Sequence, residues 1–248
     1  MPPAMHFLDR IHSERRLTGF TKLDGTVRFY SFVKAIMRDL DCRRVMDFGA
    51  GRGAFASLDR GWRRDLQDLR QFGAEVWACD VDPVVESHPC SDHQVVIEPG
   101  APLPFDDGHF DMIVSDVTFE HLDDAGAAAR ELLRVLRPGG VICARTPNKY
   151  GYASLLTRMV PNWLHVRFLR RIQPGREAKD IFPTRFRLNS VRAVRRHFAG
   201  ADVHWYRDSA EPAYYFGNGI LYRLGLFAHK LLPDVLATSL CLFIVKRG

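Results

Sequence analysis

The stretch that decides the fold is Val45-Met46-Asp47-Phe48-Gly49-Ala50-Gly51-Arg52-Gly53. A short apolar run, predicted to be a strand, leads into a glycine-rich turn, and residues 54–72 after the turn are predicted to be helical. The glycines permit a tight turn and let a ligand approach the backbone without meeting a side chain. Their spacing is GxGxG, and Ala54 stands where a GxGxxG motif has its third glycine, so the pattern disfavours dinucleotide binding.

The rest of the chain continues this alternation of strand and helix. Apolar runs bounded by turn residues predict strands at 74–80, 95–98, 110–115, 141–144, 202–206 and 239–246. Apolar residues at helical spacing predict helices at 27–40, 122–136 and 190–198. This order predicts an α/β fold with a doubly wound, mostly parallel, seven-stranded Rossmann-like sheet whose last strand is antiparallel. Ligands of such sheets bind at the carboxyl ends of the strands, near the topological switch point.

Composition and cysteine content are those of an ordinary globular protein. Hydrophobic residues make up 46% of the chain and charged residues 26%. The five cysteines are odd in number and form no CxxC pair, which argues against a disulfide framework and a structural zinc site and favours the cytoplasm. No signal-peptide core is expected at the N-terminus. The longest apolar run, residues 235–245, is shorter than the roughly 20 residues of a membrane-spanning helix.

Positive charge is concentrated in one segment. The net charge of the chain is +6, whereas residues 158–196 alone carry eleven Lys and Arg residues against Glu177 and Asp180. This excess favours an anionic partner. The alternative is a solvated surface that acidic patches elsewhere balance.

Four stretches, taken in order, resemble the motifs of a known family. Residues 45–53 resemble motif I of class I S-adenosylmethionine-dependent methyltransferases, and Trp77-Ala78-Cys79-Asp80 resembles the strand ending in an acid that follows it. Two later stretches are similar to motifs of the type 11 branch: Pro102-Leu103-Pro104-Phe105 with Phe110-Asp111-Met112-Ile113-Val114-Ser115, and Glu120-His121-Leu122 with Arg134-Val135-Leu136-Arg137-Pro138-Gly139-Gly140. The resemblance covers about residues 26–148 and implies the class of enzyme and its cofactor, but no substrate.

The length of the chain favours one domain over residues 1–248, and the pattern along it adds an inserted lid. Its expected parts are an N-terminal extension (1–25), a cofactor-binding core (26–146), a basic lid after the fifth strand (147–189) and a C-terminal part that completes the sheet (190–248). The lid is inferred because the regular pattern breaks there at several prolines.

The methionine end of S-adenosylmethionine is assigned to the glycine turn by this resemblance. Asp47 would help to hold the ammonium group of the cofactor. The residues expected to line this end are Gly49, Ala50, Gly51 and Gly53.

The ribose is assigned to Asp80, at the end of the second strand. A carboxylate offers two acceptor oxygens to a vicinal diol, so Asp80 would accept hydrogen bonds from both ribose hydroxyls. Asp82 is the competing candidate, although a turn-forming role before Pro83 is favoured for it. Val81 completes the expected contacts at this strand end.

The adenine side departs from the family pattern. Where the family often has an aspartate, about four residues before the Leu-Pro-Phe element, this chain has Pro99. Backbone groups of Gly100 or Ala101 are therefore expected to contact the adenine, with Glu98 as a less well-placed acid.

The substrate side of the predicted site begins at the end of the fourth strand. Ser115 and Asp116 are expected to face the cofactor and the substrate. His121 follows closely, and because the unperturbed imidazole suits proton removal at neutral pH, it is the candidate general base for an oxygen nucleophile. The alternative is that the Glu120-His121-Leu122 pattern only caps the helix predicted to begin near Leu122.

The lid supplies the remaining candidate residues. It mixes aromatic side chains with arginines, which suits a phosphorylated or carboxylated acceptor that also has an apolar or sugar part. The expected substrate-binding residues are Asn148, Tyr150, Tyr152 and Arg185. No metal site is predicted, because the His88–His93 cluster lies in a short connection and lacks a second ligand group at matching spacing.

The predicted function is O-methylation of a small molecule, such as a sugar, a glycolipid or a specialised metabolite. The alternative is an RNA methyltransferase or RNA-binding protein, which the basic pI of about 9.2 favours, although no RNA-binding module is appended. A non-catalytic scaffold is the third interpretation, and the intact glycine and aspartate set argues against it. The apolar stretch 214–232 is expected to pack over the sheet edge, with peripheral membrane contact or dimerisation as alternatives.

Overall fold

The computed structural model describes residues 7–57, 61–159, 184–209, 211–212, 215 and 217–248. Its strands are β1 (Arg44–Phe48), β2 (Glu75–Asp80), β3 (His93–Val96), β4 (Phe110–Asp116), β5 (Leu136–Pro147), β6 (Ala201–Asp208) and β7 (Ser239–Lys246). Its α-helices are α1 (Phe7–Ile11), α2 (Arg15–Thr18), α3 (Gly25–Asp39), α4 (Gly61–Gln67), α5 (Ala125–Val135), α6 (Tyr152–Met159), α8 (Val191–His197) and α9 (Gly219–Leu231). Short 3-10 helices are η1 (Ala54–Ser57), η2 (Pro83–Ser87) and η4 (Asp234–Leu236).

The described strands form one seven-stranded sheet in the order β3-β2-β1-β4-β5-β7-β6. Neighbouring strands from β3 to β5 pair in parallel, and β7 pairs antiparallel with both β5 and β6. The order reverses direction at β1 and β4, which makes their carboxyl ends the topological switch point. The predicted fold class is therefore confirmed.

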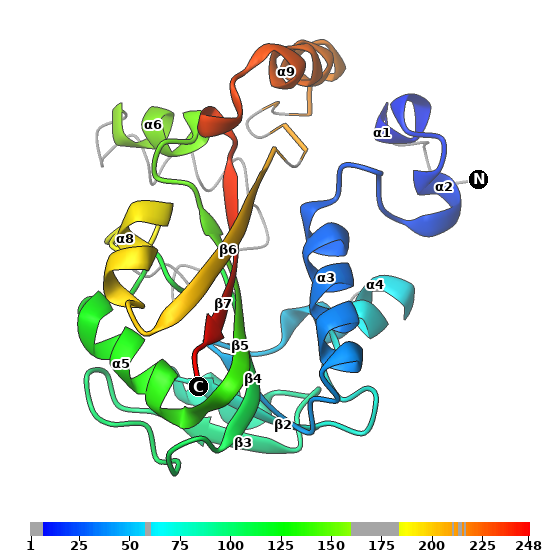
Figure 1. Cartoon of the computed structure of the whole chain (residues 1–248). Coiled ribbons are helices and arrows are strands. Elements are labelled where there is room, and N and C mark those ends of the chain that lie inside the picture. The colour runs from blue at the N-terminus through cyan, green and yellow to red at the C-terminus, as the bar shows by residue number, and fades with distance from the viewer. Residues whose placement is uncertain (1–6, 58–60, 160–183, 210, 213–214, 216) are drawn as a thin grey trace.

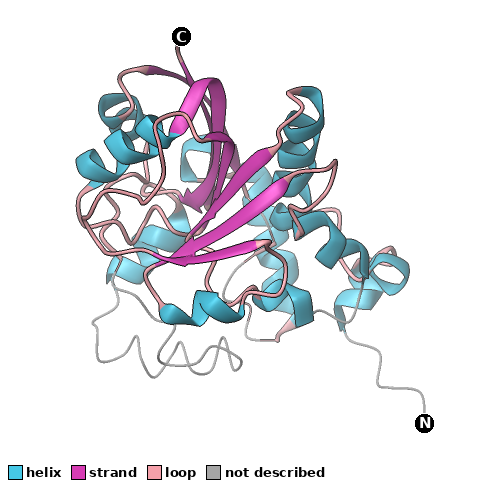
Figure 2. Cartoon of the chain, turned by 90° about the horizontal axis from the view of Figure 1, so that it is seen from below, coloured by secondary structure: helices cyan, strands magenta, loops and turns pink. Residues whose placement is uncertain are grey.

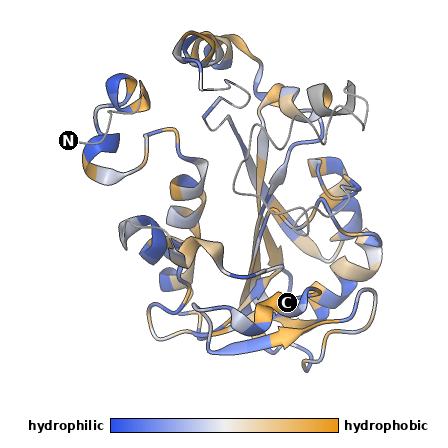
Figure 3. Cartoon of the chain, turned by 180° about the vertical axis from the view of Figure 1, so that it is seen from behind, coloured by the Kyte–Doolittle hydropathy of each residue, from blue (hydrophilic) through white to orange (hydrophobic). Residues whose placement is uncertain are grey.

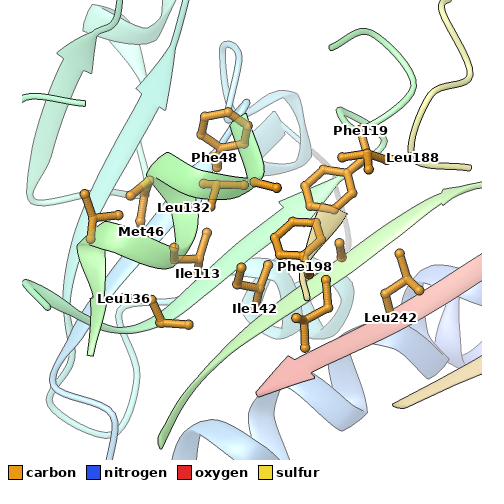
Figure 4. Close-up of a cluster of buried hydrophobic side chains, with 14 of the residues drawn as sticks. Met46, Phe48, Ile113, Phe119, Leu132, Leu136, Ile142, Leu188, Phe198 and Leu242 are labelled. Carbon is orange, nitrogen blue, oxygen red and sulfur yellow. The ribbon is translucent and has the colours of Figure 1, made fainter. Parts of the chain in front are cut away.

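Helices cover both faces of the sheet, as Figures 1 and 2 show. On one face α5 and α8 pack over a core that includes the fully buried Leu132, Ile142 and Phe198 (Figure 4). On the other face α3 buries Phe29 and Val33 against the sheet. Both cores combine residues from helices and strands far apart in sequence, so they fix the strand ends relative to one another.

Local signals explain where the helices begin. The Asp24 carboxylate accepts hydrogen bonds from the backbone N–H groups of Thr26 and Val27 and so caps α3. Asp124 does the same for α5, which begins three residues later than predicted. Because Asp124 is the cap, the alternative in which the Glu120-His121-Leu122 pattern caps this helix is wrong.

Other element boundaries differ from the predictions. The single helix predicted at 54–72 is replaced, among its described residues, by the short helices η1 and α4. The third strand begins at His93, two residues before the predicted start, and β5 begins at Leu136, where a helix end was expected. Leu136 pairs with Phe110, so the sheet extends into the Pro-Gly-Gly turn.

Most of the predicted basic lid lies outside the described residues, because residues 160–183 are not among them. Five of its cations fall in that range: Arg167, Arg170, Arg171, Arg176 and Lys179. Within the described residues no helix combines the length and the apolar character needed to cross a membrane.

The apolar stretch near the C-terminus forms α9, between β6 and β7. Its ribbon carries orange apolar segments at one end of the molecule in Figure 3. Only Tyr222 of this helix is buried. The expectation that the stretch packs over the sheet edge is therefore wrong for most of its apolar side chains.

Candidate cofactor and acceptor site

The glycine turn after β1 has two packed glycines, Gly49 and Gly53, and one open glycine, Gly51. Gly49 has φ +80°, and a Cβ there would collide with the side chain of Thr118. Gly51 has φ +56°, and its Cβ position has no atom within 4 Å. Left-handed backbone is accessible to glycine at little cost, so both positions suit glycine, but only Gly51 leaves room for a ligand. A Cβ at Gly53 would collide with His88. Ala50, which lies between Gly49 and Gly51 in the sequence, is half-buried.

The end of β2 holds this turn in place. The backbone N–H groups of Gly49 and Ala50 donate to the Cys79 carbonyl, at 2.7 and 3.2 Å. The Gly51 N–H donates to Asp80 Oδ2 at 2.8 Å, and the Asp82 N–H donates to Asp80 Oδ1 at 2.9 Å. Asp80 thus shapes the turn with both oxygens, and each oxygen retains further lone-pair capacity for a ligand.

Asp82 has the structural role that the sequence favours for it. Its side chain accepts a hydrogen bond from the Val84 N–H at 2.9 Å and caps η2. The assignment of the ribose to Asp80 stays a prediction.

Three carboxylates gather at the ends of β1, β2 and β4. Burial raises the pKa of Asp47 to about 7, and the negative charges of Asp116 and Asp80 contribute to this rise. The backbone of Asp47 pairs with Val114 of β4 and Ala78 of β2, which places the three strand ends side by side. A site with this excess of negative charge favours a cation.

Asp116 is paired with a cation that the sequence did not single out. Arg145, on β5, donates to both Asp116 oxygens at 2.7 Å, and its other nitrogen donates to Thr26 Oγ1 at 3.1 Å. Both members of the pair are largely buried. The sequence could have indicated this ion pair only through the register of β4 and β5, which places Asp116 opposite Arg145.

Ser115 lies beneath the surface of the site. Its side chain is fully buried, and its Oγ has no hydrogen-bond partner among the described residues. Successive strand residues point to opposite faces, so Ser115 cannot share the orientation of Asp116. The two residues therefore differ in orientation, and the expectation that Ser115 faces the ligands stays a prediction.

The residues predicted to contact the adenine lie in the segment after β3. The Ile97 N–H donates to the Asp80 carbonyl at 2.9 Å and brings this segment to the end of β2. Gly100 has φ +80° with no atom within 4 Å of its Cβ position, and the Ala101 N–H donates to the Glu98 carbonyl at 3.2 Å. Val81 is 41% exposed beside them and offers an apolar surface to a base.

A buried hydrogen-bond chain ends at Glu120, next to His121. Asn189 Nδ2 donates to Thr146 Oγ1 at 2.6 Å, and Thr146 Oγ1 donates to Glu120 Oε2 at 2.9 Å. Glu120 Oε1 lies 3.9 Å from His121 Nε2. The Glu120 side chain is buried, and burial raises its pKa. These hydrogen bonds hold the Glu120 carboxyl group next to the candidate base. The sequence had not indicated a role for Thr146 or Asn189.

The four predicted substrate residues have different environments. Asn148 is buried, and its amide donates to the carbonyls of Val235 and Ala237, which is a structural task. Tyr150 is half exposed. The Tyr152 hydroxyl lies 2.6 Å from His229 Nε2 on α9.

Arg185 lies beside the loop that carries the candidate base. Its guanidinium forms an ion pair with Asp123 at 2.6 Å, and its backbone N–H donates to the Glu120 carbonyl. The structure therefore does not gather the four predicted residues in one place.

A cavity of about 780 Å³ lies next to the carboxyl end of β6, at the edge of the sheet that also carries the glycine turn. Asp208, at the end of β6, forms part of its wall and is ion-paired with Arg28 of α3. The cations Lys22, Arg223 and Lys230 and the apolar Leu226 and Phe227 also line it. A smaller cavity of about 440 Å³ is lined by Asn148, Tyr150, Arg192, Arg195 and Trp205, among others. Sequence patterns gave no sign of the larger cavity, because its walls come from distant segments.

The histidines of the His88–His93 cluster contact other residues of the protein. His88 is buried against Gly53, and His93 Nε2 lies 2.6 Å from Glu75 Oε1. Within the described ranges, no group of three or more His, Cys, Asp or Glu side chains is arranged to hold a metal ion. The five cysteines are all buried and free of disulfides.

Comparison with known proteins agrees with this geometry. A family model described as "Methyltransferase domain" matches residues 46–144. The chain is 31% identical over 184 residues to a demethylmenaquinone methyltransferase of Roseiflexus castenholzii, covering 65% of this chain and 73% of that protein. A malonyl-[acyl-carrier protein] O-methyltransferase of Pseudescherichia vulneris is 35% identical over 106 residues, which are 41% of this chain and 38% of that protein. Against that second relative, the chain spans less than half of the relative's length.

Solved structures share the fold. A putative sarcosine dimethylglycine methyltransferase from Galdieria sulphuraria superposes with a TM-score of 0.54 and 18% identity, covering 90% of this chain and 85% of that one. The chain belongs to the class I S-adenosylmethionine-dependent methyltransferases, type 11 branch.

Proposed function

We propose that this protein transfers a methyl group from S-adenosylmethionine to an oxygen atom of a small amphipathic acceptor, such as a sugar, a glycolipid or a specialised metabolite, that carries an anionic group. The observation that carries the proposal is the arrangement of an open glycine turn and three carboxylates at the switch point of the sheet. Fold alone would not support an activity, so the argument rests on these side chains.

The residues of the turn fit the proposed cofactor. The open space above Gly51 admits the methionine part against the backbone, and Asp47 offers a carboxylate to its ammonium group. Asp80 offers lone pairs to the ribose hydroxyls from the end of β2. When bound, the cofactor supplies an electrophilic methyl group on a positively charged sulfur. The net negative charge of this corner favours such a cation.

The larger cavity supports an anionic, partly apolar acceptor. Its volume of about 780 Å³ lies within the range of small-molecule sites. Among its cations, Arg223 and Lys230 form no ion pair with another described residue, so both are available to an anion. Leu226 and Phe227 offer apolar contact to the rest of the molecule. The name of the malonyl-[acyl-carrier protein] O-methyltransferase relative supports oxygen as the methylated atom.

His121 is the residue we propose to remove a proton from an acceptor hydroxyl. Its ring faces the buried Glu120 carboxyl, which can stabilise the imidazolium that forms. Thr146 and Asn189 hold Glu120 in position and so act on His121 only indirectly.

Calorimetric titration with S-adenosylhomocysteine, the expected product, tests the proposal without an acceptor. We expect one-site binding, weakened at least about tenfold by Asp80→Asn, because this variant loses a charged hydrogen-bond acceptor. Asp39→Asn is the matched control, since Asp39 is an exposed carboxylate paired only with its neighbour Arg38. A folded wild-type protein that does not bind the product would disprove the proposed function.

A further inference from the structure

The helix α9 presents an uncovered apolar stripe to solvent. Ile220, Leu224, Phe227 and Leu231 follow an i, i+4, i+7, i+11 spacing, which places them on one helix face. Their exposed fractions are 70, 59, 62 and 69%. Scattered exposed leucines need no explanation, but four large apolar side chains in one line form a patch that marks an interaction site.

The opposite face of α9 is anchored, so the stripe has a fixed direction. Tyr222 is fully buried, and its hydroxyl lies 2.9 Å from His12 Nε2. Its ring makes edge-on contacts with Phe7 of α1 and with Tyr215. The helix is thereby held against the N-terminal segment with its apolar stripe turned outward.

The charges of α9 are all positive. The helix contains Arg223 and Lys230, both exposed, and no Asp or Glu. At 100° per residue these two cations lie together along one flank of the stripe. An apolar face bordered by lysine and arginine is the arrangement of helices that lie in a membrane interface, where cations meet anionic headgroups.

A second copy of the chain is a poorer occupant of this stripe. A stable interface takes roughly 20–30 residues from each partner, whereas α9 has 13 residues and exposes four along its stripe. Two copies meeting on α9 would also bring Arg223 and Lys230 of both chains together, and like charges repel. Charge complementarity therefore favours an anionic lipid surface.

We infer that α9 docks the protein on an anionic lipid bilayer, with the stripe inserted at the level of the headgroups. The helix lies beyond the carboxyl edge of the strands, on the same side as the site (Figure 1). Arg223 and Lys230 also line the larger cavity, so a headgroup bound by them would lie at the rim of that cavity. Docking in this way would suit an acceptor with a lipid tail.

Flotation with vesicles tests the docking without cofactor or acceptor. Vesicles of equal parts phosphatidylcholine and phosphatidylglycerol are compared with vesicles of phosphatidylcholine alone. We expect the wild-type protein to float with the mixed vesicles and much less with the neutral ones. The combined variant Ile220→Ser/Leu224→Ser/Leu231→Ser should lower the partition coefficient at least about tenfold, because three apolar side chains no longer leave water.

The matched control replaces exposed apolar residues elsewhere. Leu40→Ser/Trp62→Ser removes side chains that are 42 and 59% exposed near α3 and α4, and it should leave vesicle binding unchanged. Circular dichroism and titration with S-adenosylhomocysteine, run on the same preparations, show whether each variant is folded. Because product binding is measured without vesicles, a failure of docking is distinct from a failure of the proposed methyl transfer.

Three results would overturn the inference. One is a wild-type protein that stays with the vesicle-free fraction. Another is a folded serine variant that floats as well as the wild type. The third is light scattering that shows a dimer for the wild type and a monomer for the serine variant, which would assign the stripe to a second copy. If the serine variant does not fold, the comparison of anionic and neutral vesicles with wild-type protein still decides the matter.

Discussion

The two ends of the carboxyl edge of the sheet differ in the charge of the side chains that line them. Around β1, β2 and β4 the site consists of turn backbone and carboxylates, one of them, Asp47, with a pKa raised to about 7. Around β6 and α9 the larger cavity is lined by five arginine and lysine side chains, by Glu14, Asp208 and Asp234, and by apolar side chains, so its cations outnumber its carboxylates. The first end suits a cation and the second an amphipathic anion. The proposed transfer from a cationic donor to an anionic acceptor would use this difference in charge.

The two ends also differ in how the chain encodes them. The carboxylate end comes mostly from strands that follow one another through residues 44–116. The cationic end combines α1, the segment before α3, α3, the end of β6, α9 and η4. Contiguous motifs specify the first end, whereas tertiary packing assembles the second. Variants that change one end at a time therefore test whether the two ends differ in this way.

The largest effect is expected from Gly49→Ala in the glycine turn. The new Cβ would collide with Thr118 at a left-handed backbone position. Backbone strain and overpacking together should lower the free energy of unfolding by about 2–5 kcal/mol. Urea denaturation measures the change, and binding of S-adenosylhomocysteine should be lost with it.

Gly200→Ala is the control for this variant, because a Cβ at Gly200 meets no atom within 4 Å. If Gly49→Ala were as stable as this control, the packed turn would not be what fixes the carboxylate end.

The glycine variant also shows why the carboxylate end could be predicted from the sequence. Strand, glycine turn and acidic strand end follow from local patterns, and Asp80 and the turn lie where these patterns place them. Arg145 was not predicted, because its partner is 29 residues away in a neighbouring strand. The burial of Ser115 was not predicted either, because a position at a strand end does not say which face of the sheet the side chain joins.

The cationic end left fewer signs in the sequence. The apolar spacing of α9 indicated a helix, and such spacing normally means burial. Among the residues of α9 only Tyr222 is buried, and the opposite face is exposed. Whether an apolar face is covered depends on the rest of the fold, so residues 214–232 alone could not decide it.

The second largest effect is expected from Arg145→Met. The substitution leaves Asp116 without its cation beside Asp47, with both side chains of the former pair largely shielded from water. Removing one partner of a buried pair should cost about 2–4 kcal/mol of unfolding free energy. Arg38→Met is the control, because the Arg38–Asp39 pair is exposed and should contribute less than about 1 kcal/mol. Equal losses in urea denaturation would contradict the special role of Asp116 and Arg145.

A smaller effect is expected from pH at Asp47. Its raised pKa of about 7 means that the folded, ligand-free protein holds a proton which the unfolded chain releases near pH 4. Stability without ligand should therefore fall as the pH rises from about 4 to about 7.

Ligand binding should show the opposite trend. The ammonium group favours the ionised carboxylate, so the affinity for S-adenosylhomocysteine should fall about tenfold for each pH unit below 7. Calorimetry across this range measures it, and Asp47→Asn should give a flat profile. A wild-type profile as flat as that of the variant would show that Asp47 does not meet the cofactor.

The smallest effect is expected at the cationic end, from Arg223→Ala, because an exposed cation contributes little to any single contact. Octyl phosphate, an anionic amphiphile, serves as the probe for the larger cavity. Its dissociation constant should rise about fivefold, the equivalent of roughly 1 kcal/mol, while the affinity for S-adenosylhomocysteine stays unchanged. Arg247→Ala is the control, since Arg247 is an exposed arginine paired with Asp202 beyond the opposite edge of the sheet. Equal losses of octyl phosphate affinity in both variants would show that binding depends on the overall positive charge of the protein. The larger cavity would then not be the anion-binding end of the site.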